Sequence, residues 1–138
     1  MRKIIFSIIG IVAIGGLATG IYLWNKPHKN MQRAAADLTV AATDLMAAFK
    51  NDENAANAKY LDKVVAVSGK VRETTTNDGV TVISLDAADD FGSITCELDQ
   101  RSEQSRTTFS PGEFITLKGM CAGNNGIDVV LVRCVLVE

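Results

Sequence analysis

The chain has 138 residues and a formal net charge of −2, from fourteen basic and sixteen acidic side chains. Its length allows one domain of ordinary size once a targeting segment is set apart. Residues 30–138 hold ten of the basic residues and all sixteen acidic ones, a net charge of −6. A domain this acidic is poorly suited to collecting phosphate backbones, which argues against nucleic acid as its ligand.

An uncharged apolar segment, residues 4–24, follows two basic residues at the start of the chain. As a helix it would span roughly 30 Å, the thickness of a hydrocarbon core. Tyr22 and Trp24 would then lie at the interface, where aromatic rings concentrate. We predict an uncleaved transmembrane anchor and linker over residues 1–29. A cleaved signal peptide is the alternative, because residues 18–20, Ala-Thr-Gly, form a passable cleavage site.

The orientation of this segment follows from its short N-terminal tail. Basic residues are nearly balanced on its two sides, but a two-residue tail ahead of a signal-like segment usually stays inside the cell. We therefore predict a single-pass protein of the bacterial inner membrane with its domain in the periplasm. The spacing of Gly16 and Gly20 is compatible with pairing of two such helices, so a homo-oligomer is one expectation. No cysteine lies near the segment, which excludes a lipid anchor on cysteine.

Residues 30–61 are predicted to be a helical lead-in. Asn30 is a suitable N-cap for the sequence MQRAAADLTVAATDLMAAFK, in which apolar residues recur at three- and four-residue spacing. Alanine fills many of the other positions, so helix propensity and pattern agree. We predict one long helix over residues 31–50. The polar sequence NDENAANAKY should end it and start a second, short helix before Tyr60.

From Asp62 onward the apolar residues recur with a period of two, which indicates β-strands. In the first strand Val65, Val67, Gly69 and Val71 share one face. Further strands are predicted at 80–85, 93–98, 113–121 and 127–137, separated by turn sequences and by a polar stretch at 99–110. Five strands in residues 62–138 indicate a small closed β-barrel.

Gly69 lies among the β-branched residues of the first strand, where a glycine normally marks a bulge, a bend or a close approach. We predict a bend, because the first strand of a narrow barrel has to coil strongly to serve both halves of the wall. Gly119 is predicted to act in the same way in the fourth strand.

Four stretches together resemble a known family: KYLDKVVAVSGKV, ITC, PGEFITLKGMCAG and DVVLVRCVLV. They are similar to the bacterial OB-fold family labelled tRNA-anticodon-like (tRNA_anti-like), over about residues 55–137. The resemblance implies a mainly β protein with a five-stranded Greek-key OB barrel, often placed behind a signal, lipid or membrane anchor. It implies oligonucleotide binding only by distant analogy of fold, and no established activity.

Residues suited to catalysis or to a metal site are scarce. The single histidine, His28, lies in the linker, and no nucleophile-elbow, zinc-protease, phosphate-loop or dinucleotide-binding pattern occurs. Asp86, Asp89 and Asp90 cluster on a predicted loop, where acidic residues are usually solvated; a loose calcium site is the alternative. We expect no enzymatic activity, no cofactor and no metal.

The three cysteines fall at apolar positions of predicted strands. Cys96 shares a face with Ile94 and Leu98, Cys121 with Ile115 and Leu117, and Cys134 with Val130 and Val132. Two interpretations stay open: three buried thiols that act as small hydrophobes, or a periplasmic disulfide with one thiol left over. A regular hairpin places Cys121 and Cys134 roughly 20 Å apart, too far for a bridge. The third and fifth strands of an OB barrel lie side by side, so the resemblance implies Cys96 and Cys134 as the pair.

OB barrels bind ligands across strands two and three, between the loops that join strands one to two and four to five. Around this face the sequence offers five candidate ligand-binding residues: Lys70, Arg72, Lys118, Asn124 and Asn125. The alternative for Lys70 and Arg72 is a solvated outer face. The paired aromatic residues on which bases stack are missing from the strands.

These observations predict a non-enzymatic, membrane-anchored binding module of the bacterial cell envelope, with a protein or a small envelope molecule as its ligand. Two alternatives stay open. One is single-stranded nucleic-acid binding through the OB face, and the other is a structural role in which the anchor and the helix over residues 38–49 assemble copies of the chain.

Overall fold

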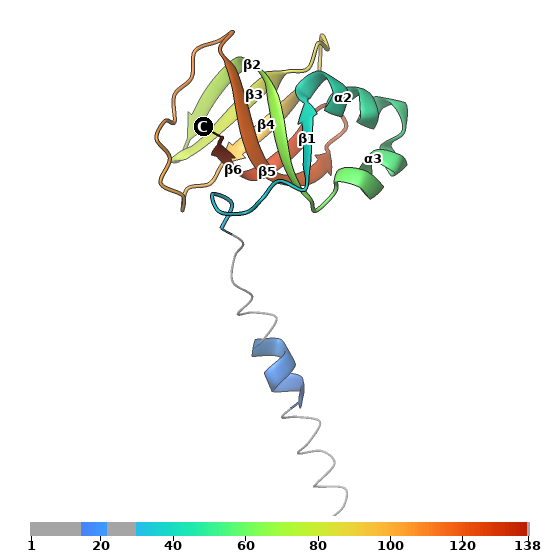
Figure 1. The fold of residues 1–138 in the computed structure, drawn as a ribbon, viewed down its shortest axis with the longest axis vertical. Helices are drawn as coiled ribbons and strands as arrows, with labels where there is room; N and C mark the ends of the chain where they lie inside the picture. The colour runs from blue at the N-terminus through green and yellow to red at the C-terminus, as the bar shows by residue number, and fades with distance from the viewer. Residues whose placement is uncertain (1–14, 22–29, 138) are drawn as a thin grey trace, which may run out of the picture.

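The segments of alternating polarity form strands, and a computed structural model, which describes residues 15–21 and 30–137, arranges these strands as a barrel with two short helices beside it (Figure 1). The elements in chain order are β1 (Leu38–Ala41), α2 (Ala42–Asn51), α3 (Glu53–Tyr60), β2 (Val64–Asn77), β3 (Val80–Asp86), β4 (Ser93–Leu98), β5 (Phe114–Asn124) and β6 (Val129–Leu136). The five predicted strands of the barrel are therefore all present.

The barrel closes because β5 pairs on one side with β6 and on the other with β2. Its strands follow the order β2, β3, β4, β6, β5, and then β2 again. All neighbours are antiparallel except β4 and β6, which run parallel. This connectivity confirms the predicted five-stranded OB barrel and places the third and fifth barrel strands, β4 and β6, side by side.

The long strand β2 serves both halves of the wall, as predicted. Its first half, up to Lys70, pairs with β5, and its second half, from Val71, pairs with β3. Gly69 is not the bend: it pairs regularly with Ile115, and the irregularity follows it, between Val71 and Glu73. A Cβ on Gly69 would lie 2.9 Å from the Cβ of Ala42. The glycine therefore permits a close approach of α2, which corrects the prediction.

Gly119 does lie at an irregularity, since the β5–β6 register shifts between Lys118 and Met120. Two residues of β6, Arg133 and Cys134, oppose Gly119 there, which is the pattern of a β-bulge. A Cβ on Gly119 would overlap the Cys134 sulfur and would lie 3.0 Å from the Val132 carbonyl oxygen. Glycine at this position thus lets the bulged strand approach β5.

The lead-in differs from the prediction of one long helix over residues 31–50. Leu38–Ala41 form β1, which pairs in parallel with Val65–Ser68 of β2, and α2 begins only at Ala42. The Asp37 carboxylate accepts a hydrogen bond from the Val64 amide, 3.0 Å away, and fixes the start of this pairing. The second, short helix is confirmed as α3, whose N-cap Asp52 accepts a hydrogen bond from the Ala55 amide.

The core fills the barrel and continues under α2. It contains Val65, Val67 and Val71 of β2, as the alternation predicted, and inward-facing residues of every other barrel strand. Leu45, Met46 and Phe49 of α2 are buried against them. A second, smaller cluster consists of Met31, Val64 and Val135, and it packs the start of the lead-in against the outside of the barrel.

Most of the predicted membrane segment lies outside the described residues, as do Tyr22, Trp24 and His28. Residues 15–21 are helical. Within the described ranges no helix has the length and apolar character needed to cross a membrane. The anchor, its orientation and its cleavage therefore stay predictions.

Candidate ligand-binding face and pocket

The outer surface of β3 and β4 is the face on which OB barrels bind ligands. Alternation along these strands directs Ile83, Leu85, Ile94 and Cys96 into the core, where they are fully buried. Small or acidic side chains remain outside, and Val82 opposes Glu97 while Ser84 opposes Thr95 across the two strands. Neither strand sequence, VTVISLD or SITCEL, contains an aromatic residue. The two strands thus supply no ring on which a base could stack, and the exposed Phe91 lies in the loop that joins them.

Two of the three predicted cationic ligand residues serve the fold. The Arg72 guanidinium donates hydrogen bonds to the carbonyl oxygens of Asp89, at 2.7 Å, and Gly92, at 3.2 Å, and approaches the Asp86 carboxylate at 3.3 Å. Arg72 thereby holds the loop between β3 and β4. Lys118 Nζ donates to the Ala34 carbonyl oxygen at 2.7 Å and so holds the lead-in. Lys70, at the end of the β2–β5 pairing, is the one of the three that is exposed.

The two predicted asparagines form the turn between β5 and β6. Asn124 Oδ1 accepts a hydrogen bond from the Gly126 amide, and Asn125 Oδ1 accepts from the amides of Ile127 and Asp128. The Asp128 carboxylate in turn accepts from the amide and the hydroxyl of Ser93, at 2.8 and 2.9 Å. Both asparagine carbonyls are therefore used to shape this loop and to place it beside the start of β4.

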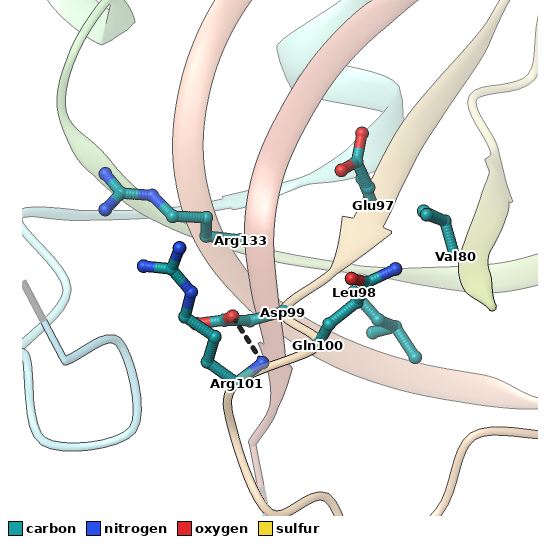
Figure 2. Close-up of a pocket in the computed structure, with 7 residues that line it drawn as sticks. All are labelled: Val80, Glu97, Leu98, Asp99, Gln100, Arg101 and Arg133. Carbon is teal, nitrogen blue, oxygen red and sulfur yellow. Dashed lines mark hydrogen bonds between the residues drawn. The ribbon is translucent and has the colours of Figure 1, made fainter. Parts of the chain in front are cut away.

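A pocket of about 300 Å³ lies where the OB face ends, next to the end of β4. Its lining residues come from β3, β4, the loop that follows β4, and β6: Val80, Glu97, Leu98, Asp99, Gln100, Arg101 and Arg133. Figure 2 shows Arg101 and Arg133 projecting toward the same side, with Glu97 and Val80 on the other. The pocket thus combines two guanidinium groups, two carboxylates and an apolar wall.

Arg133 reaches this pocket because of the β6 bulge. Its φ is 53°, in the left-handed region that a residue with a side chain rarely adopts. The register of β6 against β4 also shifts here, since Cys96 pairs with Leu131 but Leu98 pairs with Cys134. The sequence VVLVRCVL is apolar at every position except Arg133, so it has no alternation of polar and apolar residues from which the bulge could be predicted. Arg101 and Arg133 were accordingly not among the predicted ligand residues.

The two arginines of the pocket have few partners. Within residues 15–21 and 30–137, neither forms an ion pair. Arg133 Nη2 donates to the Met120 sulfur, 3.4 Å away, which is a weak acceptor. The Asp99 carboxylate accepts hydrogen bonds from the Arg101 amide and the Ser102 hydroxyl, at 3.0 and 3.1 Å, and so caps its own turn.

The bulge also corrects the expected surroundings of Cys134. This residue shares the interior with Val129 and Leu131, whereas Val130 and Val132, the predicted companions, are only partly buried. All three cysteines are free and buried. Burial and contact with the Cys96 thiol raise the pKa of the Cys134 thiol well above its ordinary value. Cys96 and Cys134 are therefore neighbours, as the resemblance implied, and a bridge between them stays a prediction.

The acidic loop after β3 is held by basic side chains. Asp86 approaches Arg72, and Asp89 forms an ion pair with Lys50 of α2. The hydrogen bond from Lys50, and then that from the Phe91 amide, lower the pKa of Asp89 below its ordinary value. Within the described ranges no three His, Cys, Asp or Glu side chains gather as metal ligands.

The chain matches the family model tRNA_anti-like over residues 1–136, a longer stretch than the one that carried the resemblance. Among solved structures it is similar to a "putative nucleic acid-binding lipoprotein" from Klebsiella pneumoniae subsp. pneumoniae, with a TM-score of 0.58 and 15% identity over 82% of this chain and 100% of the other. A "putative aspartyl-tRNA synthetase" from Leishmania major gives a TM-score of 0.44 and 9% identity over 83% of this chain and 22% of the other. At 15% identity, the similarity to the Klebsiella structure shows the fold alone. No curated protein matches the chain.

Proposed function

Because the chain belongs to the tRNA_anti-like family, we propose that it is a non-enzymatic OB-fold binding module of the bacterial cell envelope. Its ligand is a protein or a small envelope molecule, bound on the outer face of β3 and β4. In this proposal residues 4–24 anchor the chain in the inner membrane and the barrel faces the periplasm. Copies of the chain are free to associate through the anchor.

The observation that carries the proposal is the chemistry of the OB face. The strands that would stack bases carry Thr95, Ser84, Val82 and the acidic Glu97 instead of aromatic rings. Arg72 and Lys118, which would collect phosphates, are bonded within the fold. Nucleic-acid binding draws on counterion release and on base stacking, and this face supplies little of either. A protein surface or a small polar molecule suits it better.

Single-stranded nucleic-acid binding is the competing function, favoured by the description of the Klebsiella structure. A fluorescence-anisotropy titration of the full-length protein, in a non-ionic detergent at low salt, tests it with mixed single-stranded DNA and RNA. We expect no binding tighter than roughly 10 μM, because the domain is acidic and the face has no stacking platform. Tighter binding that weakens steeply with added salt would overturn the proposal.

Partner binding is tested by capture from detergent-solubilised envelope with a matched pair of variants. Thr95→Arg places a large cation on the OB face, whereas Asn54→Arg places the same side chain on the exposed surface of α3. We expect the wild type and Asn54→Arg to recover the same partner and Thr95→Arg to lose it. Recovery that is equal for all three proteins would exclude the OB face as the binding surface. Recovery of the chain itself alone would favour the structural alternative.

The anchor has its own test. With residues 4–24 uncleaved and the barrel outside, alkaline phosphatase fused after Glu138 should be active in cells, and the membrane fraction should hold the full-length mass. An inactive fusion would contradict the orientation. Loss of about the first 20 residues would instead show the cleaved signal peptide.

A further inference from the structure

We propose that the pocket at the end of β4 is a binding site for one compact anionic group, a carboxylate or a single phosphate, held by the guanidinium groups of Arg101 and Arg133. This inference rests on the proposed function and extends it. It specifies the chemical group of the ligand that would lie in the pocket at the end of the OB face.

The two arginines of the pocket lack anionic partners within the described ranges. Elsewhere Arg106 forms a two-pronged pair with the Glu113 carboxylate, at 2.7 and 2.9 Å, and Arg72 approaches Asp86. Within the described ranges, Arg101 and Arg133 have no such partner, and Arg133 is partly buried with a thioether as its acceptor. A guanidinium removed from part of its water binds best to a charged acceptor, which leaves this pair available to an external anion.

The backbone at Arg133 adopts an unfavourable conformation. A side chain at a φ of 53° is disfavoured, and glycine or asparagine would occupy the position more easily. The bulge nevertheless places an arginine there, directly before the buried Cys134 and among the residues that line the pocket, and its guanidinium projects toward the same side as that of Arg101 (Figure 2). Bulges re-aim side chains in this way next to functional sites, and strained residues concentrate there.

The volume and the lining of the pocket limit the size and charge of the ligand. The pocket volume of about 300 Å³ lies at the small end of the range for small-molecule sites. Glu97 stands on the wall opposite the two arginines and would repel a second negative group on the OB face (Figure 2). The Asp99 carboxylate is turned to its own loop, toward the Arg101 amide. The site therefore suits one anionic group beside an apolar or cationic remainder, and it disfavours a polyanion.

The test is a titration of 15N-labelled full-length protein in non-ionic detergent micelles, followed by NMR. Inorganic phosphate and acetate are the probes, and sodium chloride keeps the ionic strength constant. We expect saturable shifts of the Arg101 and Arg133 Nε resonances and of the amides of residues 98–101, with millimolar affinity. Arg101→Gln and Arg133→Asn should each weaken binding at least about tenfold, since each removes charge-assisted hydrogen bonds. The ratio of phosphate to acetate affinity identifies which anion the site prefers.

Two variants show whether a loss of anion binding is due to the pocket itself. Arg133→Asn retains the fold because asparagine tolerates the left-handed region, so its melting temperature should equal or exceed that of the wild type. Lys63→Gln removes an exposed cation outside the pocket and should leave the affinity unchanged. Shifts spread over all surface cations, or affinities that Arg133→Asn does not change, would overturn the inference.

The anion titration and the tests of the proposed function can fail independently of each other. If neither anion binds but the partner is still lost with Thr95→Arg, only the anion site is wrong. If a single-stranded oligonucleotide binds more tightly than roughly 10 μM and added salt weakens this binding steeply, the proposed function is wrong, whatever the affinity for phosphate or acetate.

Discussion

The close approach of α2 to β2 at Gly69 makes Gly69→Ala the sharpest test of the packing described above. The added Cβ would lie 2.9 Å from the Ala42 Cβ and 3.6 Å from the Leu85 Cβ. Carbon atoms in contact prefer about 3.5–4.0 Å, so α2 or β2 has to move by several tenths of an ångström. Both Cβ atoms are fixed directly to the backbone, so neither can rotate away.

The expected size follows from two opposing terms. Overpacking of a core position costs about 1–3 kcal/mol. Alanine also restricts the unfolded chain more than glycine, which offsets about 0.5–1 kcal/mol. We therefore expect Gly69→Ala to lower the free energy of unfolding by roughly 1–2 kcal/mol, and the melting temperature by about 4–10 °C for a domain of this size. Urea unfolding of the full-length protein in mild detergent, followed by circular dichroism, measures it.

A double-mutant cycle identifies the cause. Ala42→Gly removes the opposing Cβ at the start of α2, at its own cost of about 1 kcal/mol. If the two Cβ atoms clash, Gly69→Ala should cost at least about 1 kcal/mol less in the Ala42→Gly background than in the wild type. Effects that add within about 0.5 kcal/mol would refute the close-approach explanation, and a Gly69→Ala protein as stable as the wild type would refute the packing argument itself.

Three further predictions concern the loops and the thiols. Arg72→Ala should lower the free energy of unfolding by about 1–2 kcal/mol, because it removes the hydrogen bonds that hold the β3–β4 loop. The control variant Lys70→Ala should change the free energy of unfolding by no more than about 0.5 kcal/mol. Equal effects of the two variants in urea unfolding would contradict this role of Arg72. The hydrogen bonds from Arg106, and then from the Ser110 amide, lower the pKa of Glu113 below its ordinary value. The stability that Glu113 contributes is therefore present at pH values above the ordinary glutamate pKa. It is lost as the pH falls through the lowered pKa of the folded protein. Arg106→Gln should therefore flatten the acid limb of the unfolding midpoint plotted against pH, and an unchanged limb would count against this pair. The native protein should not react with a thiol reagent, because all three cysteines are buried. In urea without a reductant, three thiols should react. A count of one reactive thiol in urea would demonstrate the disulfide between β4 and β6.

The barrel was predictable because its strands carry their pattern locally. Val65, Val67 and Val71 recur with a period of two and all face the core. Turn residues such as Asp78 and Gly79, both with positive φ, mark where β2 ends and β3 begins. Burial on one face of a strand is decided by residues that are close in sequence, so alternation identifies it without knowledge of the partner strand.

The lead-in was not predictable in the same way. Alanines and apolar residues at three- and four-residue spacing fit a helix over 31–50, and this pattern holds from Ala42 onward. Between Leu38 and Ala41 the β2 backbone offers pairing partners, which stabilise a strand whatever the local helix propensity. The β-branched Thr39 and Val40 fit that strand, but the partner lies more than twenty residues away in sequence and leaves no local sign.

The candidate site depends on the least predictable feature of all, a bulge. One extra residue in β6 moves Cys134 into the core and Arg133 to the pocket, and the almost entirely apolar sequence around them gives no sign of it. The five residues proposed from the sequence, in contrast, were chosen for their chemical types near the expected loops. Those types are also the ones that close turns and brace loops, which is what Arg72, Asn124 and Asn125 do.

The packing of the lead-in against the barrel determines how far the barrel could move from the proposed anchor. Met31 is fully buried against Val64 and Val135, and Lys118 Nζ bonds the Ala34 carbonyl, so the chain is joined to the barrel from residue 31 onward. With the proposed span ending at Trp24, six residues remain between the two, and they reach at most roughly 22 Å. The OB face would then sample only a thin layer above the membrane. A membrane-bound partner within that layer would meet it at an effective concentration set by this reach rather than by the number of copies in the cell.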